Sequence, residues 1–244
     1  ALMSDFGTAL IFFVAFLCIA FLRTGDLPSI VMITAAAGFA GGIVLRFKPY
    51  VLARFAVWRH AWEYAQKGGY QQTRTMSAVA SGGRFGAGPE EAWLKYVGAA
   101  NTDLVFGVVS EEFGLLLALC AAAAVILLGI YALRAAGRSR SSFYAIAACA
   151  TAAMLVFQTT LNVLGSVDLL PLTGVTFPFV SMGGSSMLSC WGLLAYLQAA
   201  APPPVSAKAA PKAPAPAVKP PQATGFLDEL GVATDDIFGK EDAR

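Results

Sequence analysis

Long uncharged, apolar stretches recur along the chain. Four of them are rich in alanine, leucine, isoleucine, valine and phenylalanine, and they extend over Phe6–Leu22, Leu27–Leu45, Phe113–Leu133 and Ser141–Val167. A helix needs about 20 predominantly apolar residues to cross the hydrocarbon core of a bilayer. Each stretch is therefore predicted to be a membrane-spanning helix.

A fifth span is predicted at Ser186–Ala200, after a segment that prolines and glycines interrupt. The breaks fall at Pro171, Pro178, Gly183 and Gly184. Because proline and glycine end helices and set turns, Asp168–Ser185 is expected to be a structured re-entrant loop. This loop either lines a substrate groove or only holds its turns, with Ser185 or Ser186 capping the helix that follows.

The distribution of basic residues predicts one further, hidden crossing. Three basic clusters are separated by the apolar stretches: Arg46 to Lys67, Arg134 to Arg140, and Lys208 to Lys219. The positive-inside rule favours the cytoplasm for all three, and they share one side only if the chain crosses once near Gly69–Ala80. That span contains Gln71, Gln72 and Arg74, so we expect it to face the protein interior or a wet cavity.

The composition agrees with a protein that lies in a bilayer. Hydrophobic residues make up 57% of the 244 residues and charged residues only 13%, whereas a soluble domain carries about a quarter charged residues. The net charge of +2, from 17 basic and 15 acidic residues, does not indicate a surface that binds nucleic acid. Residues 1–200 are therefore predicted to form an all-α polytopic membrane protein, a helical bundle of about six transmembrane helices.

The end of the chain has a different composition. Residues 201–224 are rich in proline, alanine and lysine, which predicts a disordered cytoplasmic linker. Residues 225–244 combine apolar and acidic side chains. This tail either keeps the protein soluble or folds as a short motif on a partner.

The predicted topology leaves three segments outside: Arg23–Asp26, Gly82–Asp103 and Asp168–Ser185. Asp103 stands where the second of them meets the next helix, so its carboxylate suits either a helix N-cap or the acceptance of a proton from a hydroxyl group. Glu111 and Glu112 follow about 12 Å along the same predicted helix. Charged groups at that depth are expected to pair inward, and Arg74 is the expected partner, in a pair that is either structural or functional.

Four blocks of the chain resemble, in order, the second half of the SEDS family of RodA/FtsW/SpoVE-type proteins. Asp5-Phe6-Gly7-Thr8-Ala9 is similar to the family's PDLGTA, and Gly69-Tyr70-Gln71 with Ser81–Gly86 is similar to its GYQ and SGG-FG segments. Asn101–Gly114 resembles HTDFIFAVIAEELG, and Leu170–Ser186 resembles LLPVTG-PLPFVSYGGSS. The resemblance runs from Asp5 to about Ala200 and implies the second half of a ten-helix fold, without the family's first four spans.

The resemblance implies a peptidoglycan glycosyltransferase in cell division, elongation or sporulation. Such an enzyme polymerises lipid II, a disaccharide-pentapeptide on undecaprenyl pyrophosphate, at the outer face of the bacterial cytoplasmic membrane. Asp103 matches the family's essential aspartate, the proposed general base. Lys95 is expected to neutralise phosphate, and a divalent cation, Mg²⁺ or Mn²⁺, to offset the leaving-group charge. Further candidates for substrate contact are Gln71, Arg74, Glu111, Glu112 and Ser185.

The family resemblance also implies partners: a class B penicillin-binding protein with transpeptidase activity, and other divisome or elongasome proteins. The sequence departs from the family pattern with Asn101 in place of His, Asp168 in place of Gly and Met182 in place of Tyr. Two alternatives stay open: a non-catalytic scaffold for a transpeptidase, and a flippase or transporter for the lipid-linked precursor, motivated by the polar residues predicted at membrane depth.

Overall fold

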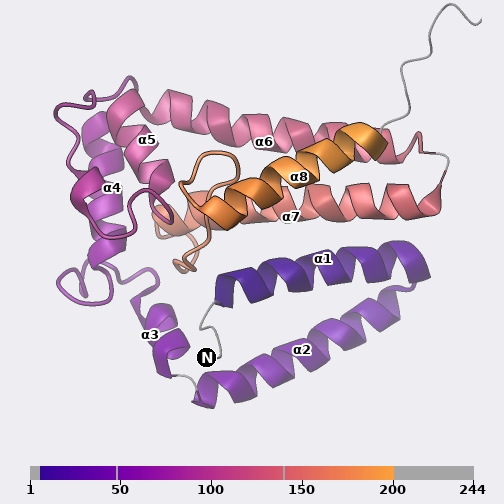
Figure 1. The fold of residues 1–244 in the computed structure, drawn as a ribbon. Helices are drawn as coiled ribbons and strands as arrows, with labels where there is room; N and C mark the ends of the chain where they lie inside the picture. Colours follow the sequence, from indigo (N-terminus) through magenta and orange to yellow (C-terminus); the bar gives the residue numbers. More distant parts are fainter. Residues whose placement is uncertain (1–5, 48, 140, 201–244) are drawn as a thin grey trace, which may run out of the picture. The chain divides into compact units, whose positions relative to one another are not determined.

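The computed structural model describes residues 6–47, 49–139 and 141–200, all within one of the chain's two units, Ala1–Pro202. These residues form helices joined by loops, without a strand, so the predicted all-α fold class is confirmed (Figure 1). The elements are α1 (Phe6–Thr24), α2 (Leu27–Phe47), α3 (Pro49–Val57), α4 (Tyr70–Gly82), η1 (Leu94–Tyr96), α5 (Val105–Phe113), α6 (Leu115–Ala136), α7 (Ser142–Ser166) and α8 (Gly184–Ala200). The predicted linker, 201–224, and tail motif, 225–244, lie outside the described residues.

Each of the five predicted apolar spans is a helix, namely α1, α2, α6, α7 and α8. Three of these, α1, α6 and α7, are long and apolar enough to cross a membrane, and the first part of α2, Leu27–Ile43, is a shorter apolar helix. Helix α7 contacts α6, α1 and α8, while α2 contacts only α1 and α3 among the pairs with substantial packing. Helix α7 is therefore the centre of the described bundle (Figure 1).

Small residues let α6 and α7 approach closely. The buried positions of α6 recur at helical spacing and include Ala118, Ala122, Gly129 and Ala132. A β-carbon at Gly129 would come within 2.7 Å of Val156 on α7. Leucines on the opposite side of α6 are exposed, as expected for helices that pack in lipid through small residues.

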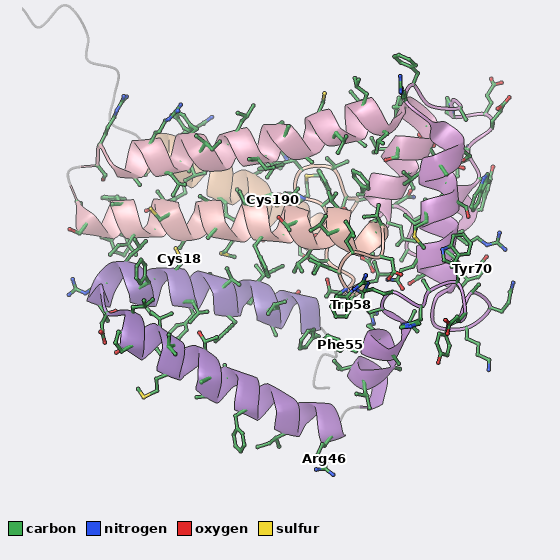
Figure 2. All side chains as sticks on the ribbon, turned by 180° about the vertical axis from the view of Figure 1, so that it is seen from behind. Cys18, Arg46, Phe55, Trp58, Tyr70 and Cys190 are labelled. Atoms are coloured by element: carbon green, nitrogen blue, oxygen red, sulfur yellow. The ribbon has the colours of Figure 1, made fainter. Side chains whose placement is uncertain are left out.

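The bundle has two ends that we name by their connections. The turn end holds the short connections Gly25–Asp26 and Gly137–Ser139, and the loop end holds α3, α4, α5 and the 167–183 loop. Figure 2 shows Phe55, Trp58 and Tyr70 together at the loop end. Helix α6 starts at the loop end and helix α7 ends there. A segment that contacts the start of α6 or the end of α7 therefore also lies at the loop end.

Helix α4 is the predicted hidden span, but it does not cross from one end to the other. Near its start, the Gln72 amide donates to Asp168 just after α7, with Nε2 and Oδ1 2.9 Å apart. Just beyond its last residue, the Gly83 carbonyl accepts from the Leu115 amide at the start of α6, at 3.0 Å. Both ends of α4 therefore lie at the loop end, where α4 runs across the direction of α6 and α7 (Figure 1). The predicted crossing at Gly69–Ala80 is wrong, and so is the prediction that Arg23–Asp26 lies on the same side as Gly82–Asp103 and Asp168–Ser185.

The basic cluster Arg46–Lys67 consequently lies at the same end as the loop that was expected on the opposite side. Trp58 Nε1 donates to the Leu169 carbonyl at 3.1 Å, and the Arg59 amide donates to Asp168 Oδ1 at 3.2 Å. The physical reason is that the positive-inside rule holds for loops shorter than about 60 residues. Residues 49–114 form a longer, folded segment, so the charges in it do not indicate which side of the membrane it lies on.

The helix expected to carry both Asp103 and Glu111 into the membrane is divided. Helix α5 ends at Phe113, and Gly114 has φ +93°, in the left-handed region. A β-carbon on Gly114 would lie 2.3 Å from the Arg84 carbonyl oxygen, so only glycine fits. The turn at Gly114 keeps α5 and its acidic residues at the loop end, beside α4.

We predict that Gly82→Ala destabilises the loop end. Gly82 is the last residue of α4, and an added β-carbon would lie 2.2 Å from the Ser110 carbonyl oxygen and 2.6 Å from Glu111 Cα. Overpacking against backbone costs about 1–3 kcal/mol, so the thermal unfolding midpoint of the purified full-length protein should fall. The matched control is Gly192→Ala in α8, which meets nothing within 4 Å. Equal midpoints for the two variants would contradict the α4–α5 contact.

Candidate functional site

Asp103 lies at the loop end on the turn that precedes α5, with its side chain partly buried. Its amide donates to the Ala99 carbonyl at 3.0 Å. The N-cap of α5 is Leu104, and no side chain caps this helix. Asp103 therefore lies one residue before the N-cap position, and the prediction of Asp103 as the N-cap is wrong.

The buried amide of Asn162 on α7 holds the Asp103 backbone in place. Asn162 is 2% exposed, and its Nδ2 donates to the Asp103 carbonyl at 2.9 Å and to the Val175 carbonyl at 2.7 Å. One side chain thus joins the turn before α5 to the 167–183 loop. Sequence reasoning missed Asn162, although an amide inside a predicted membrane span is itself a signal of a polar contact.

Two more contacts connect this loop to the residues beside Asp103. The Met182 amide donates to the Asn101 carbonyl at 2.8 Å, and the Ser181 hydroxyl, which is buried, donates to the Thr102 carbonyl. All three residues of the Asn101-Thr102-Asp103 motif are therefore held through their backbone carbonyls. The Asp103 side chain can then be presented from a rigid support.

Gly174 brings the Asp103 carboxylate and the Arg54 guanidinium close together. A β-carbon on Gly174 would lie 3.2 Å from Asp103 Oδ2 and 3.7 Å from Arg54 Nη1, and the residue has φ +74°. Any side chain here would be strained and would crowd both charged groups. Sequence reasoning missed Arg54, which comes from α3, a helix that the apolar pattern did not predict.

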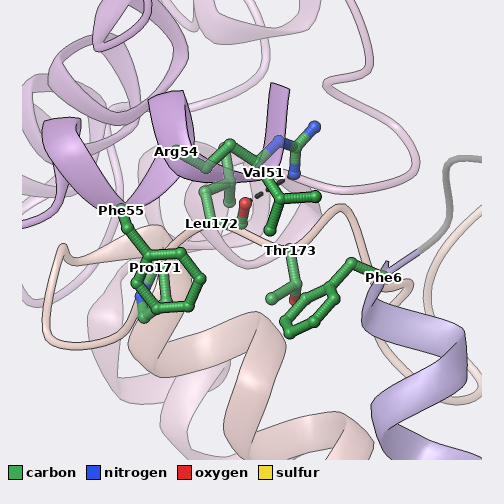
Figure 3. Close-up of a pocket in the computed structure, with 7 residues that line it drawn as sticks. All are labelled: Phe6, Val51, Arg54, Phe55, Pro171, Leu172 and Thr173. Carbon is green, nitrogen blue, oxygen red and sulfur yellow. Dashed lines mark hydrogen bonds between the residues drawn. The ribbon is translucent and has the colours of Figure 1, made fainter. Parts of the chain in front are cut away.

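A pocket opens beside the Arg54 side chain. It has a volume of about 390 Å³, and its lining comes from α3, the segment after it, the first turn of α4 and the loop: Ala53, Arg54, Ala56, Val57, Tyr64, Gly68, Gln71, Gln72 and Leu172. We call it the Arg54 pocket. Arg54 and Leu172 also line a small adjoining cavity, where the guanidinium donates to the Leu172 carbonyl (Figure 3).

The other predicted substrate residues are distributed around the loop end. Gln71 lines the Arg54 pocket and donates from Nε2 to the Gly98 carbonyl at 3.1 Å. Lys95 instead donates from Nζ to the Pro89 carbonyl at 2.6 Å, within its own loop. Ser185 is exposed in the first turn of α8, which begins at Gly184, so neither Ser185 nor Ser186 is the residue before the helix.

The predicted ion pair between Glu111 and Arg74 does not form. Glu111 is 1% exposed, and its carboxylate accepts from the amides of Trp93 and Leu94 at 3.1 and 2.9 Å. These two backbone N–H groups satisfy the buried Glu111 carboxylate. The sequence predicted that Arg74 would do so. Glu111 thereby fixes the loop that carries Lys95. Glu112 is partly buried, and its carbonyl accepts from the Gly88 amide at 3.1 Å.

Asp168, at a position where the family has glycine, has φ +60°. Aspartate tolerates the left-handed region better than most residues, and its carboxylate holds two segments through Gln72 Nε2 and the Arg59 amide.

Within the described residues no group of three histidine, cysteine, aspartate or glutamate side chains gathers for a metal ion. Since Mg²⁺ in phosphate-binding sites takes one or two carboxylates plus substrate oxygens, Asp103 alone fits such a shared site.

Residues 1–202 match the FtsW/RodA/SpoVE family model, described as a cell cycle protein. The chain is 35% identical over 196 residues to the peptidoglycan glycosyltransferase RodA of Mycobacterium leprae (strain TN), covering 79% of this chain and 42% of that protein. It is 30% identical over 215 residues to the probable peptidoglycan glycosyltransferase FtsW of Bacillus subtilis (strain 168), covering 81% of this chain and 52% of that protein. The chain therefore belongs to the FtsW/RodA/SpoVE family of multi-pass membrane proteins, and it spans about half the length of these curated relatives.

A solved structure has the same fold. It is described as "Structural coordination of polymerization and crosslinking by a peptidoglycan synthase complex", and it superposes with a TM-score of 0.62 at 24% sequence identity, over 80% of this chain and 55% of that one. The helical arrangement derived above is thus the arrangement of a known membrane fold.

We predict that Glu111→Gln loosens the segment around Trp93 and Leu94. The amide that replaces the carboxylate keeps one acceptor oxygen, so one buried backbone N–H loses its partner at a cost of about 1–3 kcal/mol. Hydrogen exchange of residues 92–97 in the full-length protein should accelerate. Glu112→Gln is the matched control, because no hydrogen bond of the Glu112 side chain occurs among the described residues. Unchanged exchange in Glu111→Gln would contradict the role of its carboxylate.

Proposed function

We propose that the full-length protein is a peptidoglycan glycosyltransferase that polymerises glycan strands from lipid II at the outer face of the bacterial cytoplasmic membrane. One observation carries the proposal: Asp103 Oδ2 and Arg54 Nη1 approach the same glycine, Gly174, at one end of an apolar bundle, and Arg54 also lines an open pocket. A carboxylate next to a guanidinium suits a reaction that takes a proton from one group and releases an anion from another. The names of the curated relatives support this reaction class.

Asp103 is the proposed general base. Its carboxylate accepts the proton of the acceptor sugar hydroxyl, whose oxygen forms a bond to the anomeric carbon of the donor. The bond from that carbon to the pyrophosphate oxygen breaks on the opposite face, and the pyrophosphate leaves with the electron pair. The configuration at the anomeric carbon is therefore inverted.

Arg54 is the proposed partner of the leaving pyrophosphate. A guanidinium binds phosphate oxygens through paired, charge-assisted hydrogen bonds, and a fixed positive charge is effective where negative charge develops in the transition state. The Arg54 guanidinium is oriented by its contact with the Leu172 carbonyl. A divalent cation, Mg²⁺ or Mn²⁺, bound to the substrate phosphates would supply further neutralisation of the leaving-group charge.

The proposed orientation has the loop end outside and the turn end in the cytoplasm. The connection between α6 and α7 is short and carries Arg138, and Arg134 lies in the last turn of α6, so the positive-inside rule applies to it directly. Helix α8 ends at Ala200, and the lysine-containing tail follows it in the sequence. In the proposed orientation this tail lies in the cytoplasm. Asp103 then faces the compartment where glycan strands are built.

A class B penicillin-binding protein with transpeptidase activity is the proposed partner, within a divisome or elongasome. The description of the solved structure, a synthase complex that coordinates polymerisation and crosslinking, supports a partner of this kind. The transporter alternative loses its basis, because α4 stays at the loop end and backbone amides engage Glu111. A transporter would need a path of polar groups through the bundle, and the proposed mechanism uses no such path.

We predict that Asp103→Asn in the full-length protein lowers the rate of glycan polymerisation from lipid II by about 10²–10⁴-fold, the usual contribution of a general base. The asparagine keeps the size of the side chain but cannot accept the proton. The matched control is Asp26→Asn at the turn end, which should polymerise at the wild-type rate. Product length and rate measured on gels decide the question, and full activity in Asp103→Asn would refute Asp103 as the general base.

A further inference from the structure

A second, more polar pocket lies on the other side of the segment that borders the Arg54 pocket. It has a volume of about 160 Å³ and is lined by Trp62, Ala65, Gln66, Thr73, Arg74 and Ser77. Tyr64, Gly68, Gln71 and Gln72, from the same two stretches of chain, line the Arg54 pocket. The segment after α3 and the first turns of α4 are therefore a common wall between the two pockets. We call the second one the Arg74 pocket.

The Arg74 side chain is oriented by aromatic rings. Its guanidinium carbon lies 5.2 Å from the centre of the Tyr70 ring and 5.9 Å from the centre of the Trp93 ring, within the range of cation–π attraction. Trp93 is itself fixed through its amide by Glu111. A flat cation is thus held on a rigid support.

The hydrogen-bonding capacity of Arg74 is not used within the described residues. A guanidinium has five N–H donors, and neither a hydrogen bond nor an ion pair of Arg74 occurs among residues 6–47, 49–139 and 141–200. Its expected partner, Glu111, is occupied by two backbone amides. Arg74 is exposed, so its donors are open to a ligand that enters the pocket.

The residues that line the Arg74 pocket indicate which part of the substrate it binds. This inference rests on the function proposed above. Lipid II carries two kinds of anion: the pyrophosphate, and the carboxylates of its peptide. In the proposed function the pyrophosphate lies at the reacting carbon, beside Asp103 and Arg54. The common wall separates the Arg54 pocket from the Arg74 pocket. The peptide branches away from the sugar, and its amide groups match the Gln66 amide and the Ser77 hydroxyl as hydrogen-bonding partners.

We propose that the Arg74 pocket binds a carboxylate of the peptide branch of the lipid-linked substrate. The guanidinium pairs with the carboxylate, and the exposed ring of Trp62, 64% accessible, covers the apolar part of the peptide. Arg74 is a specificity-determining residue in this proposal, since it contacts the substrate far from the bond that forms. Its loss should weaken binding and leave the chemical step unchanged.

The test uses two forms of lipid II, one with free peptide carboxylates and one with those carboxylates converted to amides. Equilibrium binding of each form to the full-length protein in nanodiscs gives a Kd without turnover, and polymerisation is assayed in parallel. The wild-type protein should bind the free-acid form about tenfold more tightly, as one charged hydrogen-bonded contact provides. Arg74→Gln should bind both forms equally, with a higher KM for the free acid and an unchanged kcat.

Arg84→Gln is the matched control, because Arg84 is an exposed arginine just beyond α4 that does not line the Arg74 pocket. It should keep the wild-type preference. An unchanged preference in Arg74→Gln, or equal binding of both forms by the wild type, would overturn the proposal. If Trp62→Ala reduces only retention in the membrane, Trp62 is an interfacial anchor and the pocket is not a subsite. Absence of polymer despite normal binding would instead count against the proposed function.

Discussion

A single buried amide determines where the proposed base can lie. Asn162 projects from α7, the helix with the most neighbours, and donates to the backbone carbonyls of Asp103 and Val175. Both carbonyls belong to irregular segments, and a buried carbonyl without a donor would cost about 1–3 kcal/mol. The Asp103 turn and the loop are thereby held to the same point of the bundle, where Gly174 lies close to both the Asp103 carboxylate and the Arg54 guanidinium.

The rest of the loop end is organised by side chains that satisfy backbone groups. Glu111 accepts from two amides of the loop before α5, and Asp168 accepts from the Arg59 amide and from Gln72. Acidic residues that look functional in the sequence are in this way structural supports. The Arg54 pocket and the Arg74 pocket are instead each lined by one arginine, and Arg74 lies against two aromatic rings.

The sequence predicted the apolar spans well, because length and hydropathy are local properties of the chain. It failed for α4, since the positive-inside rule was applied to a long folded segment in which charge does not determine the side. It also failed for the Glu111 and Arg74 pair, because backbone amides compete for a buried carboxylate and leave no trace in side-chain spacing. Asp103 was found from its place before a predicted helix and from a family resemblance. The roles of Arg54 and Asn162, by contrast, depend on contacts between segments distant in sequence.

The central claim is that the segments before and after α4 lie at the same face of the membrane as Asp103. Glu63 and Glu90 are exposed residues before and after α4, and Arg138 is exposed at the turn end. Single cysteines at these three positions, in a full-length protein without its native cysteines, can be labelled in intact cells with a membrane-impermeant thiol reagent. Labelling at 63 and 90 but not at 138 is the predicted result. Labelling at only one of positions 63 and 90 would contradict the account.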